Sequence, residues 1–559
     1  MASKKRRIEH EGESDSFSSD DEESDVSETD EYEFSESEGE CDRQSWSLSG
    51  EAREPFPADS DLGKVNENIP FLDRNPESIF EYFFTQELAE SIALHTNIYA
   101  SETIKKMRLE GSLKKRSRFL SWEDTDCNEV KLFIALLILQ GVVKKPTMQL
   151  YFTKDKMLAT PFFGQVMRRD RFLLLLSFIH FTIDSDQSRK EKDYHFLQIL
   201  PLLNHLKEKW QEIYRPERDI SIDESLLMWK GSLTWRTHMP RKRTRMGVKS
   251  YLLCESSTGY VYDMLIYTGE STILSDKVKD LDLKGFNKTS RVVLTLMESR
   301  LDKGHRLFLD NYFSSPKLYD TLARYKTDVV GTVRINRKDL PPDMKDKVLN
   351  PGEVCSWYRG KLMALIWRDK KDVCMLSTIH DGSMKSFKSK RRKARMKPAA
   401  VLDYNKGMGG VDLADQCINT YAIKKKRLKK FYTKIFLHLV EITVFNSYVI
   451  YNKYGANTTH LNFILNLVTN LTEKYAHSIK PKINEISRIR LSRSKEQHFM
   501  TFFPESSSRP EGRKLRKPCY LCKSENKRRV SRFWCAKCNV TLCLIPCFEK
   551  YHRKNNLVA

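Results

Sequence analysis

The hydrophobic pattern of this chain changes its period near residue 219, and the change separates two kinds of structure. From about residue 70 to residue 215, apolar residues recur at the spacing of amphipathic helices, as in Ile79–Leu94 and Leu200–Ile213. From Asp219 to Asp223, apolar and polar residues alternate, which is typical of a strand. The 559 residues are therefore predicted to form several domains, the first a helical scaffold and the next built on a sheet.

The region after residue 219 has a definite order of predicted elements. Three strands come first, and the turn Ser256–Gly259 joins the second and third into a hairpin. The predicted strands and helices are, in order, Asp219–Asp223, Gly247–Glu255, Tyr260–Thr268, the helix Arg291–Leu301, the strand His305–Asp310, a helix opened by Ser315, and the strand Asp328–Arg334. Three strands followed by helix, strand, helix and strand is the order of a ribonuclease-H-like fold.

Two aspartates are predicted to meet in this fold. Its first and fourth strands lie side by side, and Asp223 ends the first predicted strand while Asp310 ends the fourth. Carboxylates this close repel each other unless a cation joins them, and Mg²⁺ prefers oxygen ligands. Two such ions can activate a nucleophile and stabilise a leaving oxygen in phosphoryl transfer. The alternative interpretation is that each Asp is a turn or cap residue.

A third acid is expected from a later helix. Asp412 and Asp415 are three residues apart and so share one helix face, and Gly409 and Gly410 before them permit close backbone approach. Glu224 follows Asp223 on the strand, and its side chain is expected on the opposite face. It is left out of the predicted site.

Four segments around these acids resemble the hallmark segments of the piggyBac transposase family. They are Ile222–Ser225, Leu309–Phe313, Gly331–Arg334 and Met408–Gln416, and the resemblance runs from about residue 70 to the C-terminus. It implies an α+β multidomain protein. A ribonuclease-H-like DDE/D catalytic core with an insertion would lie inside a split helical dimerisation and DNA-binding domain, and a C-terminal cysteine-rich zinc domain would follow.

The resemblance also implies domain boundaries. The expected parts are a disordered acidic region (1–70), the first part of the helical domain (71–218), the first part of the catalytic core (219–335), the insertion (336–399), the last core helix (400–420), the second part of the helical domain (421–504), a basic linker (505–516) and the zinc-binding domain (517–559).

The family's activity then becomes an expectation for particular residues. By resemblance, Asp223, Asp310 and Asp412 form the catalytic triad that binds Mg²⁺, with Asp415 as an auxiliary acid. The implied reaction is cut-and-paste transposition: water frees a 3′-OH at a transposon end, the hydroxyl forms a hairpin that is reopened, and it finally attacks a TTAA target.

Six cysteines between residues 519 and 547 carry a metal signature. Two Cys-x₂-Cys pairs are each able to supply two zinc ligands from one turn. The candidate ligands are Cys519, Cys522, Cys535, Cys538, Cys543, Cys547 and His552. Two interleaved sites need eight ligands and seven are counted, so the eighth is water or a residue outside the pattern, or only one zinc site is complete.

Charge indicates a polyanionic partner. The chain carries +22 overall, yet residues 1–62 hold 21 acidic against 6 basic residues, so the remainder is strongly basic. Basic runs bracket the acids in sequence, as suits a phosphate track; solvated faces or import signals are the alternative. The predicted DNA-contacting residues are Arg241, Lys242, Arg243, Arg245, Arg427, Lys429, Lys430, Arg528 and Arg529, together with Arg334 and Arg337, which the resemblance adds.

These observations lead to two hypotheses of function. The first is a nuclear, Mg²⁺-dependent DNA transposase that acts as a homodimer on double-stranded DNA, namely transposon terminal repeats and TTAA targets. The second is a domesticated, transposase-derived nuclear DNA-binding protein without catalytic activity. A membrane location is not expected, because the apolar stretch Ile435–Ile450 is interrupted by polar and charged residues.

Overall fold

A computed structural model describes most of the chain. The described residues are 45–50, 53–69, 75–182, 194–240, 245–387, 395–423, 428, 430–476, 500–502, 516–535 and 538–554. They fall into two compact units, one within Met1–Ile479 and one within Lys480–Ala559.

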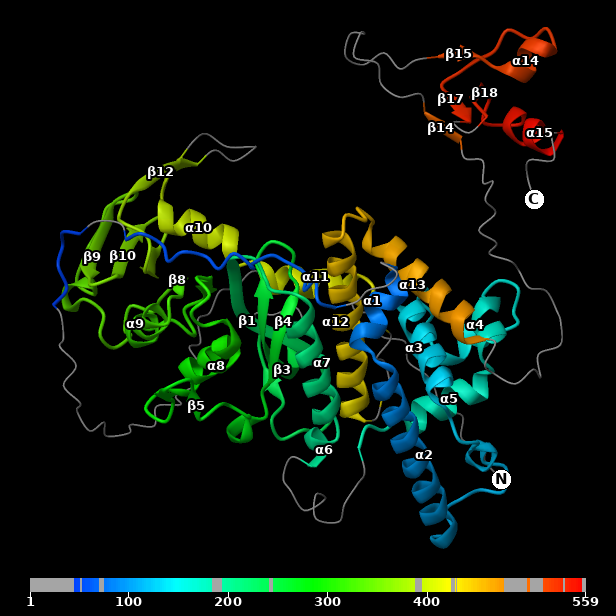
Figure 1. Ribbon diagram of the computed structural model, residues 1–559, viewed down its shortest axis with the longest axis horizontal. Coiled ribbons are helices and arrows are strands. Elements are labelled where there is room, and N and C mark those ends of the chain that lie inside the picture. The colour runs from blue at the N-terminus through cyan, green and yellow to red at the C-terminus, as the bar shows by residue number, and fades with distance from the viewer. Residues whose placement is uncertain are drawn as a thin grey trace, which may run out of the picture. The chain divides into compact units, whose positions relative to one another are not determined.

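The first unit contains a helical part and a sheet part (Figure 1). Its α-helices are α1 (Pro76–Phe83), α2 (Gln86–Leu109), α3 (Cys127–Val142), α4 (Pro161–Val166), α5 (Arg169–Phe178), α6 (Tyr194–Leu197), α7 (Leu200–Ile213), α8 (Lys288–Met297), α9 (Pro316–Arg324), α10 (Ala399–Gly407), α11 (Gly410–Thr420), α12 (Phe431–Lys453) and α13 (His460–Tyr475). Its strands are β1 (Asp219–Met228), β2 (Thr237–His238), β3 (Met246–Glu255), β4 (Val261–Ile266), β5 (Lys277–Val278), β6 (Leu281–Asp282), β7 (Arg306–Leu309), β8 (Asp328–Thr332), β9 (Val354–Arg359), β10 (Leu362–Arg368), β11 (Asp372–Ser377), β12 (Met384–Phe387) and β13 (Arg395–Pro398).

The main sheet has the predicted ribonuclease-H-like core. Its strand order is β2-β3-β1-β7-β8-β11-β10-β9, with β4 paired to β3. β1 runs parallel to β7, and β7 runs parallel to β8, whereas β1 and β3 are antiparallel. The predicted neighbours, the first and fourth strands, are therefore confirmed. One detail is wrong: β1 continues to Met228 because it pairs with β3 along its whole length, so Asp223 lies in mid-strand rather than at its end.

The segment predicted as an insertion (336–399) joins this sheet. β11 pairs antiparallel with β8, and β10 and β9 follow as a meander that extends the sheet. Of its strands, only β12 and β13 form a sheet of their own. β10 and β11 form an antiparallel hairpin, and they continue the core sheet because the edge of β8 offers backbone groups with which β11 pairs.

The helical part brings together segments that are far apart in sequence. α3 packs on α13, and α1 packs on both α12 and α13 (Figure 1). α12 is mostly apolar and is buried along most of its length, including the polar residues His438, Glu441 and Asn446, as is typical of a core helix. In the part of the chain that is described, it alone is long and apolar enough to cross a membrane, and 89% of its most apolar window is buried inside the protein.

Part of the region predicted to be disordered (1–70) has a definite structure. Residues 45–50 and the first part of 53–69 contact the sheet part of the unit, and residues 63–66 bond to residues 213–216 at the end of α7. Ser47 and Tyr358 exchange backbone hydrogen bonds of 2.9 and 2.7 Å at the edge strand β9. The Phe56 N–H donates to the buried Asp328 carboxylate at 2.8 Å. The prediction is wrong here because a few apolar anchors and a sheet edge suffice to order an otherwise polar segment; residues 1–44 lie outside the described part.

α11 rests on the sheet at a point of very close backbone approach. A Cβ at Gly410 would lie 2.6 Å from the Ser221 hydroxyl oxygen and 2.8 Å from the Glu255 carbonyl oxygen. Gly259, in the turn between β3 and β4, has φ +76°, and a Cβ there would lie 2.9 Å from the Ala414 amide nitrogen. Glycine is required at both positions, because any side chain would push α11 away from β1 and β3.

We expect Gly410→Ala to destabilise the protein by about 2–4 kcal/mol, since the Glu255 carbonyl is fixed in the sheet. Gly409→Ala is the matched control, because nothing lies within 4 Å of a Cβ at that position. Urea unfolding of both variants measures the difference. Equal stability of the two variants would show that α11 is not held by this contact.

Candidate active site and zinc-binding unit

The carboxylates of Asp223 and Asp310 lie together, as the strand order predicts. Ile222 and Leu309 are register partners in the parallel pair β1–β7, so the two aspartates that follow them lie side by side. Ligand oxygens of Asp223, Glu224 and Asp310 all lie within 4.8 Å of one another. Glu224 therefore belongs to the acid centre, which we define as these three residues. The expectation that it would point away is wrong, because Asp310 sits just beyond the end of β7, where its carboxyl group is within reach of both.

Burial and charge both act on Asp310. Burial raises the pKa of its carboxyl group, and the Glu224 carboxylate raises it further, to about 6, although the N–H groups of Tyr312 and Phe313 oppose the shift. Such a shift marks a carboxylate whose negative charge is poorly compensated by the chain itself. The Asp223 carboxylate is oriented locally, because it accepts a 2.8 Å hydrogen bond from the Glu224 N–H.

α11 brings the other two predicted acids to the same face of β1. The Ser225 hydroxyl donates to Asp415 Oδ1 at 2.7 Å, which ties the helix to the strand. Asp412 is exposed, in the first turn of α11. Burial and the carboxylates of Asp310, Asp223 and Asp412 together raise the pKa of Tyr404 to about 12. All three predicted triad members thus act on one buried hydroxyl group. Among the described residues, however, neither Asp412 nor Asp415 belongs to the 4.8 Å cluster.

The acid centre fits a hard divalent cation by its chemistry. Its donors are carboxylate oxygens from adjacent strands, which are the ligands that Mg²⁺ and Mn²⁺ prefer. Their mutual repulsion, recorded in the raised pKa of Asp310, is what a bound cation would relieve. Asp223 and Asp310 are therefore the residues that would hold such an ion, with Asp412 on the helix beside them.

The predicted DNA-contacting residues have different surroundings. Arg245, Arg334, Arg528 and Arg529 are exposed. Arg337 instead donates to the Asn311 and Tyr312 carbonyl oxygens, at 3.2 and 2.6 Å, and so supports the loop after Asp310. Lys430 donates to the Ser177 carbonyl oxygen at 3.0 Å and lies over the Tyr99 ring. The remaining predicted contacts, Arg241, Lys242, Arg243, Arg427 and Lys429, lie outside the described residues.

The second unit is a small cysteine-rich body. Its elements are β14 (Met500–Phe502), β15 (Lys517–Pro518), α14 (Tyr520–Ser524), β16 (Val530–Ser531), β17 (Phe533–Cys535), β18 (Val540–Thr541) and α15 (Cys547–Lys554). The seven predicted ligands separate into two groups whose ligand atoms lie within 4.8 Å of one another. One group is Cys519, Cys522, Cys543 and Cys547, and the other is Cys535, Cys538 and His552.

The two groups alternate along the chain, so the unit has the arrangement of two interleaved sites, one of the alternatives that the sequence left open. The first group has the four sulfur ligands of a closed tetrahedral zinc site, with Cys522 Sγ 3.6 Å from Cys547 Sγ. Burial raises the pKa of Cys519, but hydrogen bonds from the Cys522 and Cys543 N–H groups outweigh it, so that the pKa is lowered overall. These contacts favour the thiolate form that zinc requires.

His552 is arranged as a ligand of the second group. Its Nδ1 donates to the Phe548 carbonyl oxygen at 2.8 Å, which leaves the lone pair on Nε2, 3.6 Å from Cys538 Sγ. The side chain is fully buried. In the part of the chain that the structure describes, this group offers three ligands, so the fourth position stays open.

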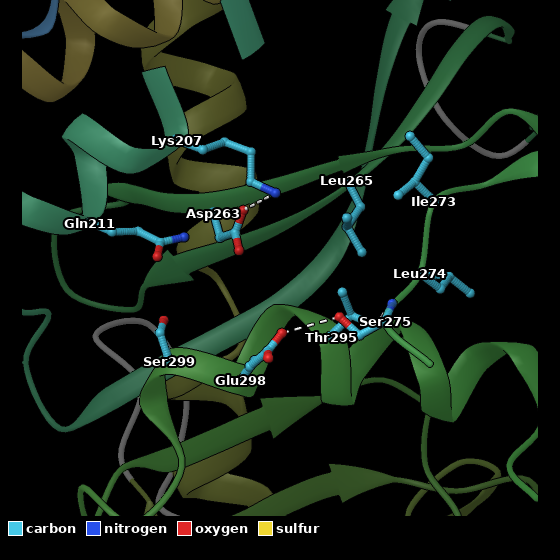
Figure 2. Close-up of a pocket in the computed structure, with 10 residues that line it drawn as sticks. All are labelled: Lys207, Gln211, Asp263, Leu265, Ile273, Leu274, Ser275, Thr295, Glu298 and Ser299. Atoms are coloured by element: carbon cyan, nitrogen blue, oxygen red, sulfur yellow. Dashed lines mark hydrogen bonds and ion pairs between the residues drawn. The ribbon is translucent and has the colours of Figure 1, made fainter. Parts of the chain in front are cut away.

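A separate cavity of about 400 Å³ lies between α7, β4 and the segment around α8. Figure 2 shows the Lys207 ammonium directed at the Asp263 carboxylate, at 2.8 Å, and Ser275 bonded to Glu298. Burial raises the pKa of Asp263 despite this ion pair. None of the predicted site residues lines the cavity, so it is distinct from the acid centre.

Some of these features were missed in the sequence. Glu224 was considered and left out, and neither Ser225 nor Tyr404 was assigned a role, although Ser225 bonds Asp415 and Tyr404 lies within the electrostatic influence of the predicted triad. Ser225 carried a usable signal, because it stands two residues after Asp223 and therefore on the same strand face. Tyr404 carried no such signal, since only the packing of α10 against β1 and β8 places it among the acids.

Sheet order and acid centre together define a transposase-type core, and comparison with known proteins agrees. Residues 75–448 match the family model described as Transposase IS4. Human piggyBac transposable element-derived protein 3 is 25% identical over 492 residues, which is 86% of this chain and 76% of that protein. Human piggyBac transposable element-derived protein 2 is 23% identical over 401 residues, covering 68% and 62%.

A solved structure shares the fold. The chain matches a piggyBac transposase from a synaptic complex with hairpin DNA, with a TM-score of 0.63 and 23% identity, over 84% of this chain and 97% of that one. This chain belongs to the piggyBac-type transposase family.

Two interleaved metal groups predict two zinc ions per chain. Cys522→Ser should lower the zinc content by about one ion, and Cys535→Ser should remove the other, because each replaces a thiolate in a different group. Cys374→Ser, on β11, is the control and should leave zinc unchanged. Elemental analysis of the purified variants measures the ratio. If neither Cys522→Ser nor Cys535→Ser loses zinc, these groups are not metal sites.

Proposed function

We propose that the protein is a DNA transposase that cuts and joins DNA strands with divalent metal ions. The observation that carries the proposal is that Asp223 on β1 and Asp310, just after the adjacent parallel strand β7, lie side by side, with the Asp412 helix fixed against β1. The reaction class follows from the family, and the finer expectations are Mg²⁺ as the ion, a hairpin step and TTAA as the target.

Different side chains of the chain would have different roles in this reaction. Asp223, Asp310 and Asp412 would hold the metal ions, and bound ions would supply activation of the attacking oxygen and stabilisation of the leaving one. Ser225 fixes Asp415 and with it the position of α11. The exposed Arg334 stands near Asp310, whose carboxylate it influences electrostatically, and so is suited to hold a DNA phosphate beside the acids.

The partners and location belong to the same proposal. Double-stranded DNA is the substrate, bound at the terminal repeats by the zinc-binding unit, where Arg528 and Arg529 are exposed. The solved relative is described in a synaptic complex with hairpin DNA, which supports this choice of partner. A homodimer brings two ends together, and DNA as the substrate implies a nuclear location.

A DNA-binding protein without catalysis is the competing function. The specific observation in its favour is that the human relatives are described as derived from transposable elements. The acid centre argues against it, because closely packed carboxylates cost stability and contribute nothing to binding anionic DNA.

Excision in cells tests the proposal. A donor plasmid carries a marker between candidate terminal repeats flanked by TTAA. The wild type should restore TTAA precisely, and Asp223→Asn or Asp310→Asn should lower excision at least about a hundredfold, since each removes a metal-ligand charge. Asp369→Asn, an exposed acid in the β10–β11 turn, is the matched control.

Measuring how the protein binds the same terminal repeats distinguishes a transposase from a non-catalytic DNA-binding protein. Specific binding without excision by the wild type would establish the non-catalytic function. Excision that survives Asp223→Asn and Asp310→Asn would overturn the assignment of the acid centre.

A further inference from the structure

A lysine side chain lies against the acid centre. The Lys249 ammonium is 3.1 Å from a Glu224 carboxylate oxygen, and both side chains are only 10% exposed. Lys249 pairs with Leu226 across β1 and β3, and therefore lies diagonally next to Glu224 on one face of the sheet. Through Glu224, this ammonium adjoins a group of three carboxylates whose oxygens are within 4.8 Å of one another.

Aromatic rings hold the lysine in place. Its ammonium lies 4.6 Å from the Tyr312 ring centre, 4.8 Å from that of Tyr251 and 5.9 Å from that of Tyr267. Ring faces attract cations, most strongly where water is excluded. Tyr312 also donates its backbone N–H to Asp310 at 3.0 Å, so the cage and the acid centre share a loop. The positive charge is therefore fixed in position.

The charges define what this arrangement does. Three close carboxylates without a cation repel one another, and the ammonium offsets part of that charge. The same ammonium repels any divalent ion that enters, so it must weaken the hold of the acid centre on that ion. The positive charge of Lys249 therefore stabilises the metal-free acid centre and weakens its binding of divalent ions.

We propose that Lys249 is the resident counter-ion of the acid centre: it stabilises the metal-free protein and lowers the affinity for divalent ions, so that they exchange. This inference rests on the proposed function, because it assigns Lys249 a role at the same metal site. Lys249 acts through Glu224 and is a positioning residue.

The test compares Lys249→Met with the wild type as full-length, zinc-loaded protein. Mn²⁺ binding is measured by isothermal titration calorimetry, and thermal unfolding is followed with and without Mn²⁺. Lys249→Met should lower Tm in the absence of Mn²⁺ and bind Mn²⁺ about tenfold more tightly, since the loss of one nearby positive charge strengthens the attraction. Lys249→Arg keeps the charge and should bind Mn²⁺ as the wild type does.

Lys209→Met is the matched control. Lys209 also pairs with a glutamate, Glu212, at 2.7 Å and lies over a tyrosine ring, but it belongs to α7 rather than to the acid centre. Its loss should change Tm equally with and without Mn²⁺ and leave Mn²⁺ affinity unchanged. Glu224→Gln supplies the opposite sign for the metal: it removes one negative charge from the acid centre and should weaken Mn²⁺ binding, a result that can be measured even if Lys249→Met does not fold.

The possible failures are distinct. If Lys249→Met loses the same Tm with and without Mn²⁺ and binds Mn²⁺ like the wild type, Lys249 is only a structural residue and the inference is overturned. Mn²⁺ bound at the acid centre should be lost in Asp223→Asn. If the wild type binds no Mn²⁺, or if Asp223→Asn binds it equally well, the metal centre of the proposed function is wrong instead.

Discussion

The parallel pairing of β1 with β7 is the constraint on which this molecule depends. It places two strands about 4.8 Å apart. It therefore fixes Asp223 and Asp310 next to each other although their negative charges repel. The hydrogen bonds and apolar side chains of the strands hold this register, and the carboxylates must accept the repulsion that follows. Burial, together with the neighbouring Glu224 carboxylate, raises the pKa of Asp310 to about 6, which shows that a negative charge is costly at this position.

Residues around the acid centre position its acids and offset part of their charge. Gly410 and Gly259 let α11 approach the sheet, and the bond from Ser225 to Asp415 ties the helix to β1. Lys249, which lies against tyrosine rings, supplies a positive charge beside Glu224 of the acid centre. α12, buried along most of its length, packs against α1 and α7 from the first half of the helical part and α13 from the second. Stability is thus provided elsewhere in the fold, as is usual for a functional site.

Much of this could be predicted from local sequence. The order of strands and helices follows from hydrophobic period, and the order alone places Asp223 beside Asp310. The zinc ligands follow from their spacing, because two residues between cysteines fit one tetrahedral site. What could not be predicted depends on tertiary contacts. The pairing of β11 with β8, the ordered segment around Ser47 and Phe56, and the placement of Tyr312 against Lys249 each require partners that are dozens to hundreds of residues away. Glu224 was excluded by the alternation rule, which fails at a strand end where the neighbouring acid has already left the sheet.

The central claim is that the acids of β1, β7 and α11 form one binding centre for divalent ions. Anomalous diffraction from crystals of the protein with Mn²⁺ tests it most directly. The account predicts a manganese peak between Asp223 and Asp310, on the side of the sheet that carries Asp412. Zinc peaks at the cysteine groups serve as an internal standard for detection. Clear zinc peaks without manganese at the acids, at millimolar Mn²⁺, would contradict the account.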